Sequence, residues 1–178
     1  MKLRRQNLVT LLVYKIAIVL VVACGLSAQS EQEAVREKAR AIHDRIVTID
    51  AHVDIPFDFA TPTVDPGILG SYQVDLPKMT EGGLDAVFFN VYVAQEERTS
   101  ETYAKAQADA HIKFDAIHRM TKTMHADRIE LATRADDVER IVRAGKLVAA
   151  IGIENGFIIG QDVSLIETYF DLGARYMG

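Results

Sequence analysis

Apolar residues in this chain fall into two patterns: short uninterrupted runs, and longer stretches in which they recur at the helical period. The runs are rich in β-branched residues and predict buried strands at 46–49, 84–93 and 147–153, with weaker ones at 129–131 and 174–177. The periodic stretches predict helices at 29–45, 102–124, 135–144 and 164–172. Ser164 and Glu167 have the spacing of a capping box at the start of the last helix.

The segment 55–80 interrupts this order, since it contains all four prolines together with Gly67 and Gly70. We therefore expect a long loop there. Loops of this length inside a compact domain are usually functional or disordered. Because this one follows polar residues at a strand end, we expect it to contribute to the mouth of any site at that end.

The alternation of apolar strands with amphipathic helices indicates an α/β fold with a parallel sheet and helices outside it. Two architectures fit, an open doubly wound sheet and part of a (β/α)8, or TIM, barrel. A complete barrel typically needs about 250 residues, and this chain has 178. The barrel interpretation therefore assigns this chain about the first half of one.

Residues 1–28 have the order of an export signal, with basic residues before an apolar stretch from Leu8 to Ala23 and small residues after it. Cleavage after Ala28 leaves Cys24 as an inert residue of a discarded signal. A second interpretation is a bacterial lipoprotein, in which Cys24 is lipidated, and a third is an uncleaved anchor. The signal predicts export to the periplasm or the exterior, with membrane contact only through the signal or the lipid.

Charge separates this signal from the rest of the chain. Residues 1–24 carry four basic and no acidic side chains, which leaves 16 basic and 25 acidic side chains beyond them, a formal charge of −9. A chain this acidic repels phosphate backbones, so nucleic acid is disfavoured as a partner.

His52 and Asp54 are the sharpest local signal for chemistry. Residues i and i+2 of a strand project to the same face, so an imidazole and a carboxylate point together near the end of the first strand. Zinc accepts both kinds of ligand. A bare His-x-Asp is also compatible with a hydrogen-bonded pair that only caps the strand.

Glu154 favours the metal interpretation, because it follows the apolar strand 147–153 and precedes Asn155 and Gly156, which permit a tight turn. In a parallel barrel the carboxyl ends of different strands converge at one mouth. His52, Asp54 and Glu154 can then share a metal cluster, since a carboxylate can bridge two ions about 3.5–4 Å apart.

Three further histidines repeat every seven residues along the long predicted helix, His111, His118 and His125. Seven residues of helix rise about 10.5 Å, which is too far for two of them to bind one ion. We expect these histidines to lie on a solvated or half-buried helix face.

Five sequence blocks extend this local signal over the region from His43 to Gly178. They are IDAHVD at 49–54, QVDLPKM at 73–79, EGGLDA at 81–86, AIGIENG at 150–156 and YFDLGARYM at 169–177. In this order they resemble the membrane (renal) dipeptidases, a family of zinc peptidases with a (β/α)8 barrel. Five ordered blocks are much more specific than the histidine–aspartate pair alone.

The resemblance implies a centre of two zinc ions that acts on dipeptides. In it His52 and Asp54 bind one zinc, and Glu154 bridges both ions and helps to orient the attacking water, as the catalytic residue. The family's second zinc takes two histidines from later strands, beyond residue 178, and the family has threonine where this chain has Gly178. We therefore expect residues 29–178 to be the amino-terminal portion of a metallo-dipeptidase barrel, inactive and poorly stable on its own.

The leading hypothesis is thus a zinc-dependent dipeptidase, as the full-length parent of this chain. Another metal-dependent amidohydrolase or esterase on the same scaffold is the alternative within the hydrolases. An exported, non-catalytic binding protein derived from a peptidase is the alternative from a different class. The dipeptide preference and the oligomeric state, a homodimer included, stay open.

Overall fold

The computed structural model describes residues 31–178, which divide into two units. The first unit ends at Ile46, and within it residues 31–43 form an exposed helix. The predicted signal at 1–28, with Cys24, lies outside the described residues. Between residues 31 and 178, no helix has the length and apolar character needed to cross a bilayer.

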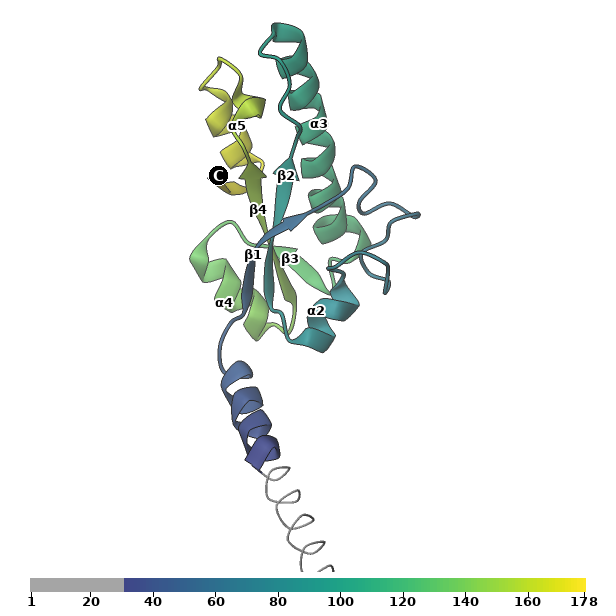
Figure 1. Ribbon diagram of the computed structural model, residues 1–178, viewed down its shortest axis with the longest axis vertical. Helices are drawn as coiled ribbons and strands as arrows, with labels where there is room; N and C mark the ends of the chain where they lie inside the picture. The colour runs from purple at the N-terminus through teal and green to yellow at the C-terminus, as the bar shows by residue number, and fades with distance from the viewer. Residues whose placement is uncertain (1–30) are drawn as a thin grey trace, which may run out of the picture. The chain divides into compact units, whose positions relative to one another are not determined.

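The second unit, Val47–Gly178, alternates strands and helices along the chain (Figure 1). Its strands are β1 (Ile49–Asp54), β2 (Ala86–Tyr92), β3 (Ile129–Leu131), β4 (Leu147–Glu154) and β5 (Ala174–Met177). Its helices are α2 (Leu76–Gly82), α3 (Ser100–Arg119), α4 (Ala135–Arg143) and α5 (Leu165–Asp171). A π-helical turn, η1 (Met120–Met124), extends α3, and a short 3-10 turn, η2 (Phe157–Ile159), follows β4.

The five strands form one parallel sheet, as the sequence predicts. β1 pairs with β2, and β2 pairs with β4. Two strands share the other edge of β4: β3 pairs with Leu147–Ala149 at its start, and β5 pairs with Ile151–Ile153 towards its end. The carboxyl ends of β1, β2, β4 and β5 therefore lie along one edge of the sheet.

Alternate side chains of the sheet belong to two different hydrophobic clusters. Phe89 of β2 is buried in the larger cluster with Phe114 of α3. Val148 of β4 is buried in the smaller cluster with Ile141 of α4. Because neighbouring strand residues point to opposite faces, α3 and α4 cover opposite faces of the sheet.

Helix α2 lies partly within the predicted loop 55–80, and the loop prediction was wrong over that part. Asp75 caps the helix by accepting a hydrogen bond from the Lys78 N–H, and Pro77 stands in its first turn. A proline there costs the helix little, because the first amides have no partner within the helix. The prolines of the segment consequently do not exclude a helix.

Two other predicted boundaries also differ from the structure. The first strand begins at Ile49 rather than at Ile46, because its pairing with β2 begins there. The prediction that this strand is buried was wrong, since β1 is an edge strand of the sheet and Ile46 and Ile49 are each 53% exposed. The predicted capping box of the last helix is absent, since the Ser164 side chain makes no cap hydrogen bond and its hydroxyl donates to Asp162.

His118 connects α3 to the end of α5 and should make folding depend on pH. Its Nε2–H donates to the Leu172 carbonyl oxygen over 2.9 Å, while its buried Nδ1 has no hydrogen-bond partner within residues 31–178. Burial lowers the pKa of His118, and the charge of Lys122 adds to this effect. The unfolded chain therefore binds the proton more readily, and we expect stability to fall as the pH drops below about 6.5.

Urea denaturation of the full chain at pH 7.5 and at pH 5.5 measures this loss. In the variant His118→Gln, the side-chain amide can still donate to the Leu172 carbonyl but does not titrate. We expect the variant to show a smaller difference in unfolding free energy between the two pH values. An equal difference in both proteins would contradict the role assigned to His118.

Candidate metal centre

Strand β1, which carries two of the three predicted ligands, pairs irregularly with β2. Ile49 and Asp54 of β1 pair with Ala86 and Asn90 of β2, so β1 uses one more residue over the same span. This β-bulge changes the alternation of side chains along the strand. Asp54 is thereby in register with Asn90, and His52 Nε2 lies 3.6 Å from Asp54 Oδ1, so the two side chains point together.

Glu154 ends β4, and the next residue fixes the turn that follows. Asn155 has a left-handed backbone with φ of 63°, a conformation that asparagine tolerates better than most residues. Its Nδ2 donates to the Val93 carbonyl oxygen over 2.9 Å, and its Oδ1 accepts from the Phe157 N–H over 3.0 Å. The tight turn predicted from Asn155 and Gly156 is present, and it is tied to the segment after β2.

The three predicted ligands meet at this edge of the sheet. His52 Nε2 lies 3.0 Å from Glu154 Oε2 and 3.6 Å from Asp54 Oδ1. One donor atom from each residue lies within 4.8 Å of the others. The side chains of His52, Asp54 and Glu154 are 48%, 60% and 37% exposed, so the group opens to solvent.

This donor set fits a divalent metal ion. Two ligand atoms at about 2.1 Å from a tetrahedral zinc lie about 3.4 Å from each other, close to the separations of His52 Nε2 from the two carboxylates. One imidazole and two carboxylates are ligands that zinc accepts. The arrangement therefore offers three ligands to one ion, with its remaining positions open to other groups.

A polar contact that the sequence did not predict lies further from the carboxyl ends of the strands than these ligands do. Tyr176 Oη lies 2.7 Å from Asn90 Oδ1 and 2.7 Å from the Ala51 carbonyl oxygen, so it connects β5, β2 and β1. Gly152 of β4 leaves the space for this contact. The one signal that could have pointed to it is Asn90 itself, a fully buried polar residue within the apolar run 84–93.

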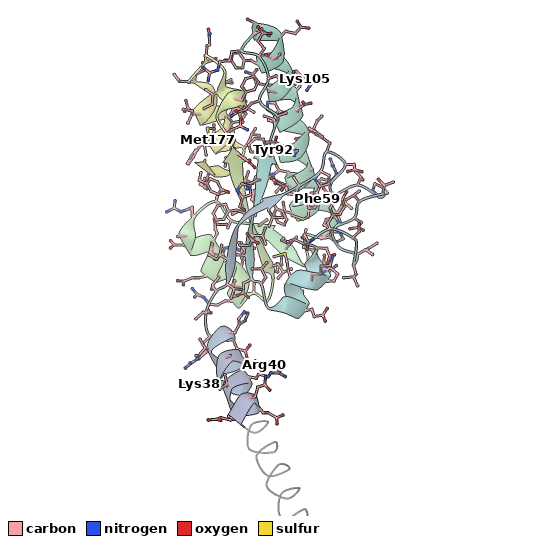
Figure 2. All side chains as sticks on the ribbon, in the orientation of Figure 1. Lys38, Arg40, Phe59, Tyr92, Lys105 and Met177 are labelled. Carbon is pink, nitrogen blue, oxygen red and sulfur yellow. The ribbon has the colours of Figure 1, made fainter. Side chains whose placement is uncertain are left out.

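The loop between β1 and α2 forms a wall of the site. A cavity of about 320 Å³ lies beside His52 and Asp54, and its lining includes Pro56, Tyr72 and Gln73 from that loop. Tyr92 and Met177, the last residues of β2 and β5, mark the same edge of the sheet, and Phe59 lies on the loop side (Figure 2).

Contacts with residues that follow η1 hold this loop in place. His125 Nε2 lies 2.5 Å from Asp65 Oδ1, and Arg128 donates to the Gly67 carbonyl oxygen over 2.8 Å. Burial acts to raise the pKa of Asp65, but hydrogen bonds from the Gly67 N–H and His125 outweigh it and hold the pKa below its ordinary value. His125 thus holds the loop in place, and it lies apart from the group formed by His52, Asp54 and Glu154.

Comparison with known proteins gives a family match over most of the chain. A sequence model of the membrane dipeptidases, peptidase family M19, matches residues 36–178. Dipeptidase tcpJ of Claviceps purpurea is 32% identical over 109 residues, which cover 59% of this chain and 25% of that protein. The match therefore concerns a part of that relative's length.

Solved structures also match this fold over part of their own length. The crystal structure of the probable dipeptidase PvdM from Pseudomonas aeruginosa has a TM-score of 0.75 and 22% identity, over 82% of this chain and 37% of that one. A metallopeptidase from Rhodobacter sphaeroides, crystallised with a phosphinate mimic of the dipeptide L-Ala-D-Ala, has a TM-score of 0.61 and 22% identity, over 75% of this chain and 45% of that one. The predicted fold class, part of a TIM-barrel-like α/β fold, is confirmed.

Proposed function

Because the chain belongs to the membrane dipeptidase family, we propose that the group at the ends of β1 and β4 is part of the metal centre of a zinc-dependent dipeptidase. The observation that carries the proposal is the contact between His52 and Glu154, which are 102 residues apart in sequence and 3.0 Å apart in space. The chain spans 25% of the Claviceps relative and 37% of PvdM, so the activity is proposed for the whole protein.

In the proposed centre His52 and Asp54 would hold one ion, and Glu154 would be a ligand of that ion and of a second. When bound, the ions supply Lewis-acid chemistry that polarises a carbonyl and makes water a stronger nucleophile at neutral pH. Three side chains suffice for one ion, and we propose that the further ligands of the second lie outside residues 31–178.

The residues of this chain then orient the reactants. His52 would ligate through Nε2, the nitrogen that faces both carboxylates, which would leave the proton on Nδ1. The Glu154 carboxylate accepts a hydrogen bond from the attacking water, which orients it, and can take up its proton. Asn155 keeps Glu154 in place through its two backbone hydrogen bonds.

A dipeptide is the substrate class that the comparisons favour. The Rhodobacter metallopeptidase of similar fold was crystallised with a mimic of L-Ala-D-Ala. The cavity of about 320 Å³ beside His52 and Asp54 in this chain lies at the lower end of the size range of ligand pockets. A compact substrate such as a dipeptide matches that size.

Metal content and hydrolysis together test the proposal. We expect the purified full chain to bind one Zn²⁺ through the described group, and His52→Ala to abolish this binding. We expect no hydrolysis from these 178 residues across a panel of dipeptides, lactones and phosphoesters, because we propose that the further ligands of the second ion lie outside residues 31–178. A chain that binds no zinc would overturn the metal centre and favour a non-catalytic binding protein. Lactone or phosphoester hydrolysis without dipeptide hydrolysis would favour the other class of hydrolase.

A further inference from the structure

Lys113 is a buried cation that the proposed centre does not use. It lies in the third quarter of α3 and is only 4% exposed. Lysine is rarely buried to this extent, because its ammonium loses hydration on leaving water. The burial of Lys113 therefore requires a specific environment around its Nζ.

Two aromatic rings supply that environment. Lys113 Nζ lies 4.9 Å from the centroid of the Phe57 ring and 5.6 Å from that of the Tyr92 ring. Both distances are within the range of cation–π attraction. Phe57 and Tyr92 are themselves 51% and 39% exposed, so the rings lie between the ammonium and solvent.

The positions of these rings place the ammonium beside the metal group. Tyr92 ends β2 and is in register with Glu154 of β4. Phe57 follows Asp54 by three residues, at the start of the loop that lines the site. Lys113 thus reaches from α3 to the edge of the sheet at which both candidate carboxylate ligands stand.

The charges that act on Lys113 agree with this position. Burial lowers the pKa of its ammonium, and the negative charges of Asp54, Glu154 and Asp109 act in the opposite direction. Two of these three carboxylates belong to the candidate metal group. Their interaction with Lys113 is mutual, so its positive charge also acts on them.

We propose that Lys113 is a positioning residue of the metal centre, which acts on it through its charge. Its fixed positive charge, near the carboxyl ends of β2 and β4, weakens the binding of the metal cation and makes the metal-loaded site more positive. The inference rests on the proposed metal centre. With one divalent ion bound, the carboxylates of Asp54 and Glu154 balance its charge, so Lys113 leaves one surplus positive charge beside it. A surplus positive charge suits a substrate that carries a carboxylate, as a dipeptide does.

Zn²⁺ titration of the full chain by calorimetry at pH 7 tests this inference. Lys113→Met keeps most of the apolar stem and removes the charge, and Lys113→Gln removes the charge but keeps a polar end. We expect both neutral variants to bind Zn²⁺ roughly tenfold more tightly, because a unit charge several ångströms from a divalent ion repels it by that order. Lys113→Arg keeps the charge, since arginine is always protonated, and should change the affinity much less than the two neutral variants do.

A control and the opposing outcomes make the test specific. Lys105→Met removes a charge about 12 Å along the same helix and should leave the affinity unchanged. A lysine that only supports the packing of α3 would give unchanged or weaker Zn²⁺ binding in the two neutral variants, and that result would overturn the role of Lys113. If the unaltered chain binds no Zn²⁺, the proposed metal centre fails first, and this inference fails with it.

Discussion

Glu154→Gln should lower the affinity of the chain for Zn²⁺ by on the order of 100-fold. The loss of a group that only supports a metal ligand already costs 10–100-fold in metal affinity, and Glu154 is itself a proposed ligand. The substitution keeps the size of the side chain and one oxygen that could face the ion, but it removes the negative charge. In the folded chain Glu154 Oε2 lies 3.0 Å from His52 Nε2, so the carboxylate is within reach of any ion that His52 binds. Calorimetric titration with Zn²⁺ measures the change.

Two controls separate a ligand from a structural residue. Glu167→Gln neutralises an exposed carboxylate on α5, so it changes the net charge equally and should leave Zn²⁺ affinity unchanged. Glu154→Gln should also leave the stability of the apo chain close to that of the unaltered chain, because Glu154 stands at an exposed edge of the sheet. Equal Zn²⁺ affinity in Glu154→Gln and the unaltered chain would remove Glu154 from the proposed ligand set.

Gly152→Ala should destabilise the fold by about 3 kcal/mol, the upper part of the range for an overpacked core. A Cβ at this position would lie 2.1 Å from Asn90 Oδ1 and 2.4 Å from Tyr176 Cζ. Asn90 is fully buried and cannot move away freely. The substitution therefore breaks the contact that connects β1, β2 and β5 below the metal group, and Zn²⁺ affinity should fall with it.

Urea denaturation of the apo chain, followed by circular dichroism, measures this loss of stability. Gly156→Ala is the matched control, because a Cβ there meets its nearest atom, Met177 Sδ, at 3.6 Å, an ordinary contact. It should change the unfolding free energy by less than about 1 kcal/mol. Similar losses in the two variants would show that the space at Gly152 has no special importance.

The parallel order of the strands could be predicted because each strand carries its own signal. Three runs stand out by their apolar, β-branched composition, and the amphipathic helices between them require crossover connections. The predicted ends of helices and strands were less accurate where one residue type is compatible with two local structures. Pro77 signals a break in most of a helix but is accepted in the first turn of α2.

The candidate site was predictable to the extent that its residues stand at recognisable strand ends. His52 and Asp54 share one strand, and Glu154 follows another, so a shared edge brings them together. The predicted loop also lines the cavity beside them. Asn90 and Tyr176 were missed, because no pattern within either segment indicates that they meet.

The sequence by itself determined the class of fold, the family resemblance and the three side chains of the candidate centre, because strand signals and ligand types are local properties. Only the tertiary structure decided how these parts meet. The β-bulge in β1 depends on its register with β2, and the place of Lys113 depends on how α3 packs against the sheet. Both come from contacts between segments distant in sequence, and the charge beside the His52–Asp54 pair is therefore set by the fold.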